Sequence, residues 1–189
     1  IEFLRRNRER SIIKVVSGIR RCGKSTLFRL FKDELLAEGV KPEQIISINF
    51  EDLEYEPLRE YHRLYQYILN QMQPNQMNYI FLDEIQHVDQ FHRVVDSLFV
   101  KENTDIYITG SNAYFMSSDI ATLLTGRYVE IQMLPLSFAE FYYSKYEEQQ
   151  YSLIPAYEAY LRESSFPYTQ QLGGEDFDIQ EYLRGLYNT

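Results

Sequence analysis

Residues 12–26 read IIKVVSGIRRCGKST, and this stretch decides the fold. Gly18, Gly23, Lys24 and Ser25 have the spacing G-x-x-x-x-G-K-[ST] of a phosphate-binding loop. The glycines permit backbone dihedrals that a Cβ forbids, so successive N–H groups can point at phosphate oxygens. The lysine supplies an ammonium group to the β- and γ-phosphates, and the serine hydroxyl suits Mg²⁺. The stretch therefore predicts a loop that binds the phosphates of a nucleotide.

The flanking residues have the pattern that such a loop requires. An apolar run at 12–16 is typical of a buried strand, and apolar residues between 27 and 36 recur at helical spacing. A glycine-rich turn is the alternative, but the strand–loop–helix order favours phosphate binding. We expect the loop to place nine residues against the nucleotide: Gly18, Ile19, Arg20, Arg21, Cys22, Gly23, Lys24, Ser25 and Thr26.

Composition limits the classes of protein to which the chain can belong. Its 189 residues are 44% hydrophobic, enough for one core with a small appendage. No apolar run approaches the roughly 18 residues that a membrane span needs, and the first ten residues lack the apolar stretch of a secretory signal. The single cysteine, Cys22, excludes an internal disulfide and fits a reducing compartment. We therefore expect a cytoplasmic protein that has no membrane segment.

The chain is acidic, with a formal net charge of −9 at pH 7. Residues 138–189 carry nine acidic and three basic side chains, a net of −6. A protein that coats nucleic acid needs clustered lysine and arginine, so the net charge does not indicate such a partner. The exception is a group of arginines, for which a solvated face and a nucleic-acid contact both stay open: Arg5, Arg6, Arg8 and Arg10.

Strands and helices alternate along most of the chain. Five apolar runs are typical of strands: 12–16, 45–50, 79–82, 105–110 and 127–133. Beyond the helix that follows the loop, residue spacing predicts three more helices: 57–72, beginning at Pro57, then 90–101 and 117–124. This alternation indicates a parallel sheet covered on both faces. The fold class that follows is an α/β three-layer sandwich with a five-stranded, mostly parallel sheet.

The character of the sequence changes at Ser137. Nine of the 17 tyrosines lie between Tyr142 and Tyr187, in a segment with helical spacing. Large amphipathic rings pack helices together, whereas a base-stacking surface would need basic residues that this acidic segment lacks. We expect a nucleotide-binding P-loop core over 1–137 and a tyrosine-rich helical segment over 138–189.

The segment FLDEIQ at 81–86 supplies the acidic groups that a phosphate-binding loop needs. An aspartate at the end of a buried strand is costly to desolvate unless a cation or donor meets it. In a phosphate-binding fold that cation is Mg²⁺, so Asp83 is predicted to share the metal with Ser25. Glu84 would then face the γ-phosphate and deprotonate the attacking water. Two ordinary acids that cap a strand are the alternative, and this dipeptide alone does not decide between them.

Two further segments supply polar groups. In ITGSNA (108–113), a strand that ends in small hydroxyl and amide residues can place Ser111 or Asn112 beside the γ-phosphate or the attacking water. Arg127, at the start of the last strand, is a cation of the type that stabilises a transferring phosphoryl group. An ordinary turn and a solvent-facing arginine are the alternatives on these residues alone.

Six short segments appear in the order typical of one family. They run from Ile12 to Phe141 and read GIRRCGKST, INFED, FLDEIQ, ITGSNA, LLTGRY and PLSFAEF. With this set the chain resembles the prokaryotic AAA+-type P-loop ATPases, which usually continue into a separate C-terminal domain. The resemblance implies that this chain stops where that region begins. At 164–167 it has Ser-Ser-Phe-Pro where relatives often have a Gly-Gly-Phe-Pro-like turn.

The resemblance also implies Mg²⁺-dependent ATP binding and hydrolysis. The two residues after the fourth strand would sense the γ-phosphate, and Arg127 would be an arginine finger or sensor, in cis or from a neighbouring subunit. The role of Glu51 in INFED stays open. The resulting catalytic set is Glu84, Lys24, Arg127, Asn112 and Ser111, with Ser25 and Asp83 as Mg²⁺ ligands.

Two functions remain open. One is an ATPase that acts on a protein partner or through self-association, and the other is an ATP-dependent switch or binding module with little hydrolysis of its own. A small-molecule kinase is disfavoured because Glu84 suits the activation of water. A GTPase is disfavoured because no N-K-x-D motif occurs. No zinc site is predicted at His62, His87 or His92, which have no cysteine partner at a suitable spacing.

Overall fold

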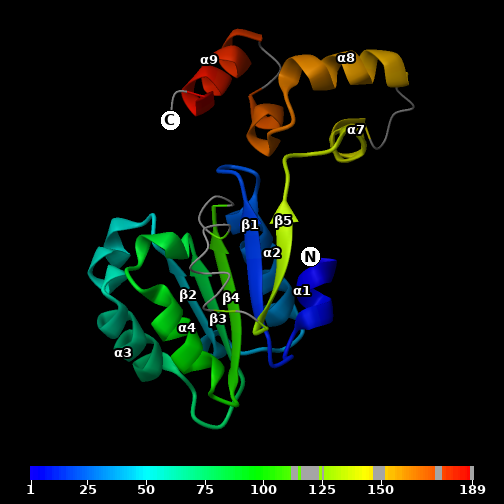
Figure 1. The fold of residues 1–189 in the computed structure, drawn as a ribbon. Coiled ribbons are helices and arrows are strands. Elements are labelled where there is room, and N and C mark those ends of the chain that lie inside the picture. Colours follow the sequence, from blue (N-terminus) through cyan, green and yellow to red (C-terminus); the bar gives the residue numbers. More distant parts are fainter. Residues whose placement is uncertain (112–114, 116–123, 125, 147–151, 173–175, 188–189) are drawn as a thin grey trace. The chain divides into compact units, whose positions relative to one another are not determined.

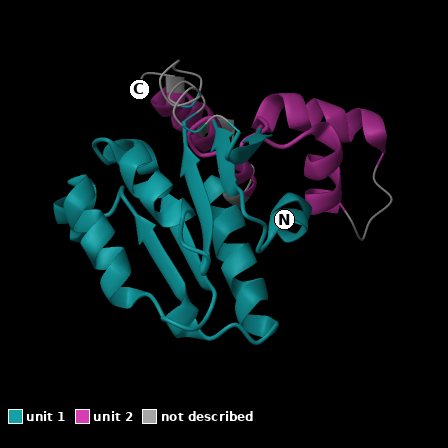
Figure 2. Cartoon of the chain, turned by 60° about the horizontal axis from the view of Figure 1, so that its bottom comes forward, with its two compact units in different colours: residues 1–18, 24–133 teal, residues 19–23, 134–189 magenta. Residues whose placement is uncertain are grey.

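The computed structural model describes residues 1–111, 115, 124, 126–146, 152–172 and 176–187. They form two compact units, coloured separately in Figure 2. Unit 1 comprises Ile1–Gly18 and Lys24–Met133, and unit 2 comprises Ile19–Gly23 and Leu134–Thr189. The sheet lies in unit 1, and the C-terminal helices lie in unit 2.

Unit 1 is built on a five-stranded sheet in which every neighbouring pair of described strands is parallel (Figure 1). The strands are β1 (Ile13–Gly18), β2 (Ile45–Asn49), β3 (Asn78–Asp83), β4 (Thr104–Gly110) and β5 (Tyr128–Met133). Their spatial order is β2-β3-β4-β1-β5, so β4 separates β1 from β3. The predicted α/β fold with five strands is confirmed.

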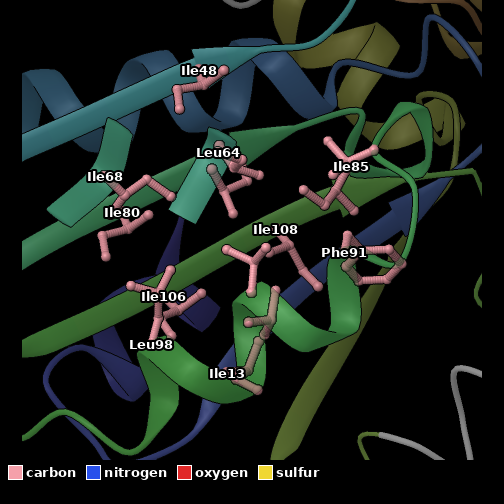
Figure 3. Packing of buried hydrophobic residues seen from close by; sticks show 14 of the residues in the cluster. Ile13, Ile48, Leu64, Ile68, Ile80, Ile85, Phe91, Leu98, Ile106 and Ile108 are labelled. Atoms are coloured by element: carbon pink, nitrogen blue, oxygen red, sulfur yellow. The ribbon is translucent and has the colours of Figure 1, made fainter. Parts of the chain in front are cut away.

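Helices cover both faces of this sheet and make it the middle of three layers. They are α1 (Glu2–Asn7), α2 (Lys24–Ala37), α3 (Tyr61–Gln71) and α4 (Phe91–Phe99), with short 3₁₀ turns at Pro42–Gln44, Leu53–Arg59 and Ile85–His87. One buried cluster joins the sheet to α3 and α4, and a second joins it to α1 and α2. In Figure 3 the first cluster brings isoleucines of the strands against side chains of the two helices.

The alternation of side chains along each strand explains the two clusters. On β3, Ile80 and Leu82 belong to the α3/α4 cluster, whereas Tyr79 and Phe81 belong to the α1/α2 cluster. The Phe81 ring stacks on the Tyr107 ring of β4, with ring centres 4.6 Å apart. Each large apolar side chain that is fully buried contributes about 1.5–3 kcal/mol to folding. Both faces of the sheet are therefore closed by packed core.

The first of the three further helices begins later than the sequence predicted. Pro57 lies in the 3₁₀ turn Leu53–Arg59, and α3 begins at Tyr61. Glu60 has extended backbone, and its carboxylate accepts hydrogen bonds from the N–H groups of His62 and Arg63. A side chain that satisfies these two free N–H groups makes Glu60 the cap, so the predicted start at Pro57 was wrong. The helix predicted at 117–124 falls almost wholly outside the described residues.

Unit 2 contains α7 (Phe138–Tyr146), α8 (Leu153–Glu163), a 3₁₀ turn at Pro167–Gln171 and α9 (Asp176–Tyr187). Aromatic rings join α7 to α8: Phe138 contacts Tyr157, and Phe141 contacts Tyr160, with ring centres 5.1 and 5.3 Å apart. The Tyr160 hydroxyl donates to the backbone oxygen of Leu136 at 2.8 Å. The rings thus combine apolar packing with a satisfied polar tip.

Across the part of the chain that the structure describes, every helix is too short or too polar to traverse a bilayer.

A buried ion pair lies at the amino ends of β1 and β4. The Lys14 ammonium donates to the Asp105 carboxylate and, at 2.9 Å, to the backbone oxygen of Arg10. The same carboxylate accepts from the Tyr107 hydroxyl at 2.6 Å and from the Glu9 N–H at 2.8 Å. Burial lowers the pKa of Lys14, and the charge and hydrogen bond of Asp105 oppose that shift. Because both side chains are fully buried, each depends on the other for its charge to be tolerated.

We expect Asp105→Ala to lower the free energy of unfolding by about 3–5 kcal/mol, because the Lys14 charge then stays buried without its partner. Urea unfolding followed by circular dichroism measures the change. The control is the double variant Lys14→Met with Asp105→Asn, which removes both charges, keeps an oxygen acceptor for the Tyr107 hydroxyl and the Glu9 N–H, and should recover most of the loss. An unfolding midpoint of Asp105→Ala equal to that of the wild type would contradict the assignment.

Candidate functional site

The predicted site residues of unit 1 meet where the parallel strands end. β1 ends at Gly18 and α2 begins at Lys24, so residues 19–23 form the connection between them. β3 ends at Asp83, and β4 ends at Gly110. In parallel α/β sheets, ligands bind at this carboxyl edge.

The connection at 19–23 is a tight turn. The Cys22 N–H donates to the Ile19 oxygen at 3.4 Å, and Gly23 has φ +105°, a value that residues with a Cβ rarely adopt. Arg21 also has a left-handed backbone, and its guanidinium lies 5.3 Å from the centre of the Tyr182 ring within unit 2. Glycine at position 23 therefore has a conformational reason, as the motif predicted.

Lys24 is a buried cation, 4% exposed, whose contacts include oxygen atoms of Gly18 and Glu84. Its Nζ donates to the Gly18 oxygen at 3.2 Å and lies 3.2 Å from Glu84 Oε1. Glu84 is 9% exposed, so this pair is shielded from most of the solvent that weakens surface ion pairs. The structure thus brings the predicted phosphate-binding lysine and the predicted general base into direct contact.

Asp83 is 7% exposed, and two hydroxyl groups bond to its carboxylate. These come from Thr109 on β4 and from Ser25, the second residue of α2. Burial raises the pKa of Asp83, whereas the hydrogen bonds from Thr109 and Ser25 lower it and the charge of Glu84 raises it further. A buried carboxylate with an unfavourable charge is a group that a cation would stabilise.

The donor set fits Mg²⁺ as a metal that is shared with a nucleotide. Ser25 and Asp83 offer a hydroxyl and a carboxylate that already contact each other. Among the described residues, no group of three or more histidine, cysteine, aspartate or glutamate side chains could hold a metal. Mg²⁺ commonly takes one or two protein oxygens and completes its shell with phosphate and water. The site therefore suits a metal that arrives with its phosphates.

Thr109 is a site residue that the sequence reasoning missed. Its hydroxyl accepts from the Glu84 N–H at 2.9 Å and donates to Asp83 Oδ1, so it links the two acids. The register pairs Leu82 with Ile108, which puts Thr109 beside Asp83. The signal was present, because Thr109 shares the strand face of Tyr107, the face toward α2. The prediction chose the residues just beyond the strand instead.

Glu84 has an unusual backbone. Its φ and ψ are +54° and +49°, in the left-handed region that few residues other than glycine adopt. One carboxylate oxygen faces Lys24, and the other accepts from Gln86 Nε2. Such strain is stored at functional sites when the surroundings hold it in place.

Lys32 of α2 is a further cation on the α2 face of the sheet, the face on which Asp83 lies. It donates to the Ser47 hydroxyl of β2 at 2.8 Å and sits 6.0 Å from the centre of the Phe81 ring. Burial lowers the pKa of Lys32, and the charge of Asp83 opposes that shift. Lys32 therefore contributes positive potential around Asp83, a contribution that the motif did not predict.

The remaining predicted residues lie at different places in the chain. Thr26 is an exposed residue of α2, Ser111 is half-buried just after β4, and Asn112 lies outside the described residues. Glu51 follows β2, and its N–H donates to Asn49 Oδ1 at 3.0 Å.

Arg127 lies at the opposite edge of the sheet. Its backbone oxygen accepts from Ile13 N–H, at the start of β1, and its guanidinium pairs with Asp96 of α4 at 2.8 Å. The six residues of β5 span about 20 Å between Arg127 and the carboxyl edge. The structure therefore does not bring Arg127 to the site within one chain. Of the two predicted alternatives, this position argues against a role in cis, because a residue before a parallel strand lies at its amino end, and a role from a neighbouring subunit stays a prediction.

The parallel sheet, with its strand order and a G-x-x-x-x-G-K-S loop between β1 and α2, defines the class of P-loop NTPases. Within this class the chain belongs to the AAA domain family, whose sequence model matches residues 10–142.

Curated relatives share most of this chain. An uncharacterized protein of Haemophilus influenzae is 42% identical over 162 residues, which cover 85% of this chain and 40% of that protein. An uncharacterized protein of Methanocaldococcus jannaschii is 32% identical over 191 residues, which cover 93% of this chain and 41% of that protein. The chain thus spans about two fifths of the length of these relatives.

A solved structure has a similar fold. It is a DNA polymerase III gamma subunit-related protein from Thermotoga maritima, with a TM-score of 0.52 and 15% identity. The match covers 83% of this chain and 57% of that chain. At this level of identity the likeness concerns the fold alone.

We expect Thr109→Val to lower the free energy of unfolding by about 1–3 kcal/mol, because the Glu84 N–H loses its hydroxyl acceptor and the Asp83 carboxylate keeps the Ser25 hydroxyl but loses that of Thr109. Thr109→Ser keeps the hydroxyl and is the matched control, with a loss of under about 1 kcal/mol for one methyl group. Urea unfolding without nucleotide compares the two variants. Equal midpoints for valine and serine would show that the hydroxyl does not link the acids.

Proposed function

We propose that the chain binds ATP with Mg²⁺ and hydrolyses it to ADP and phosphate. One observation carries the proposal: Lys24, Glu84 and Asp83 belong to a single contact network at the carboxyl edge of the sheet. Lys24 contacts Glu84 directly, and Thr109 links Glu84 to Asp83. Membership of the AAA domain family supports a nucleotide-binding function of the ATPase type.

The binding roles follow from the chemistry of each group. Backbone N–H groups of residues 18–26 would hold phosphate oxygens at the start of α2, where the helix dipole adds positive potential. Lys24 would contact the β- and γ-phosphates. Ser25 and Asp83 would hold Mg²⁺, which when bound neutralises phosphate charge.

Glu84 would act as the general base. Its carboxylate would accept a proton from water while the water oxygen bonds to the γ-phosphorus. The bond from that phosphorus to the bridging oxygen breaks, and ADP leaves with the electron pair. Before this step Lys24 must exchange Glu84 for a phosphate, so the arrival of the nucleotide frees the base.

A nucleotide-dependent switch with slow hydrolysis is the second candidate. It is favoured by the ion pair that occupies Glu84 and by the position of Arg127 at the opposite edge. In either case we propose that the process driven by ATP involves a protein partner or self-association, in a cytoplasmic setting.

We expect Lys24→Ala to weaken binding of a fluorescent ATP analogue at least tenfold, because a charge-assisted contact to phosphate is worth about 1.5–3 kcal/mol. Arg29→Ala, an exposed residue of the same helix, is the control and should bind like the wild type. Fluorescence anisotropy with Mg²⁺ measures both. Wild-type affinity in Lys24→Ala would contradict the proposed site.

Glu84→Gln should bind ATP at least as tightly as the wild type, because Lys24 no longer has to leave a charged partner, but should lower turnover by about 10²–10⁴, the usual contribution of a general base. Phosphate release under single-turnover conditions measures the chemical step. Turnover at the wild-type rate would remove Glu84 from the role of base. Tight ATP binding by a wild type with negligible turnover would favour the switch.

A further inference from the structure

The two carboxylate oxygens of Glu84 have different kinds of partner. Oε1 lies 3.2 Å from Lys24 Nζ, and Oε2 accepts from Gln86 Nε2. A phosphate competes for the lysine, because it is a stronger anion for an ammonium than a carboxylate that also bonds elsewhere. A phosphate does not compete in the same way for a neutral amide. When a nucleotide binds, the first contact exchanges and the second can stay.

The backbone on both sides of this carboxylate is held. The Glu84 N–H donates to Thr109 Oγ1 at 2.9 Å, and the Glu84 oxygen accepts from the His87 N–H at 3.2 Å. Ile85 is fully buried in the α3/α4 cluster, where Figure 3 shows it near Phe91. The left-handed backbone of Glu84 is thus fixed by its neighbours. Rotation about the side-chain bonds remains, and the contact with Gln86 restrains it.

The position of Gln86 leaves one of its polar atoms buried without a hydrogen bond in the described part of the chain, which is unfavourable for folding. Its Oε1 is buried and finds no hydrogen-bond partner among the described residues. Gly110 makes room for it, since a Cβ at residue 110 would lie 2.7 Å from that oxygen. A buried acceptor without a partner is unfavourable, so an apolar side chain of similar size would be expected to suit the fold at least as well. The amide donor toward Glu84 is the feature that an apolar side chain could not supply.

We propose that Gln86 is a positioning residue for Glu84, an inference that rests on the proposed function. Its amide holds Oε2, so that Oε1 meets the attacking water in a fixed orientation once Lys24 has moved to the phosphates. Correct orientation of a base before the reaction lowers the barrier, and small misplacements raise it steeply. Gln86 therefore acts on the chemical step and leaves nucleotide affinity almost untouched.

The test is Gln86→Met in the full chain, which keeps an unbranched side chain of similar length and removes the donor. We expect kcat to fall about tenfold, because the base loses its orientation but remains present. The dissociation constant for ATP should stay within about twofold of the wild type, and the unfolding midpoint should change little, because removal of the unsatisfied Oε1 offsets the lost hydrogen bond to Glu84 Oε2. A purely structural role predicts the reverse, with a lower midpoint and little change in kcat for the folded fraction.

Gln86→Leu is the second variant and should behave in the same way, which keeps the test valid if methionine packs poorly. Glu84→Gln provides the floor for kcat. Measurements on the wild type distinguish a failure of the proposed ATPase function from a failure of the proposed role of Gln86. A wild type that is folded but does not bind ATP would contradict the proposed function. If the wild type hydrolyses ATP and both Gln86 variants have the same kcat as the wild type, only the proposed role of Gln86 is overturned.

Discussion

The parallel register of β3, β4 and β1 is the constraint on which the rest of the structure depends. It places Leu82 beside Ile108 and Val16 beside Thr109, so the ends of the three strands share one edge. Because side chains alternate along a strand, a slip of one residue would turn Asp83 from the α2 face toward the apolar α3/α4 cluster. The apolar side chains that fix the register therefore also fix the positions of the acids. Core packing and site chemistry are two consequences of one pattern.

Carboxylates are buried at both edges of the sheet, but the groups that bond to them differ. At the amino edge, Asp105 accepts from a lysine, a tyrosine and a backbone N–H, and the network is closed. At the carboxyl edge, the Asp83 carboxylate accepts from the hydroxyl groups of Thr109 and Ser25, which are neutral donors, and the nearby charge of Glu84 adds to the effect of burial in raising its pKa. A closed network of charges mainly supports the fold, whereas an incompletely compensated one has something to gain from a ligand. The contrast explains why similar residues are assigned to stability at one edge and to function at the other.

Much of this fold could be predicted from the sequence because local patterns report local structure. Apolar runs located all five strands, and the glycines and lysine of the loop located the start of α2. The start of α3 was missed because a proline at a helix start is a weak signal beside Glu60, whose carboxylate bonds two free N–H groups.

The site was harder to predict because it depends on which strands are neighbours. The sequence does not state that β4 lies between β1 and β3, and this order is what puts Thr109 beside Asp83. Arg127 was predicted to act in cis or from a neighbouring subunit, and its position just before β5 puts it at the amino edge, away from the candidate site of its own chain. Residue type suggested the candidate chemistry, whereas topology decided which residues of that type lie together.

Under the proposed function, in which Lys24 binds the phosphates and Glu84 is the general base, the ion pair between the two would link binding to chemistry. While the pair is intact, the lysine neutralises the base and the base occupies the lysine. A triphosphate carries more negative charge than Glu84 and would replace it as the partner of Lys24. The Glu84 carboxylate would then lie beside the phosphate, and its Oε1 would be available to accept a proton. Part of the attraction for phosphate is used to break the existing pair, so ground-state affinity is lower than the contacts alone would give. Glu84 would therefore be available as a base only when the nucleotide is bound. This coupling is a reason for the proposed catalytic carboxylate to contact the lysine that binds the phosphates.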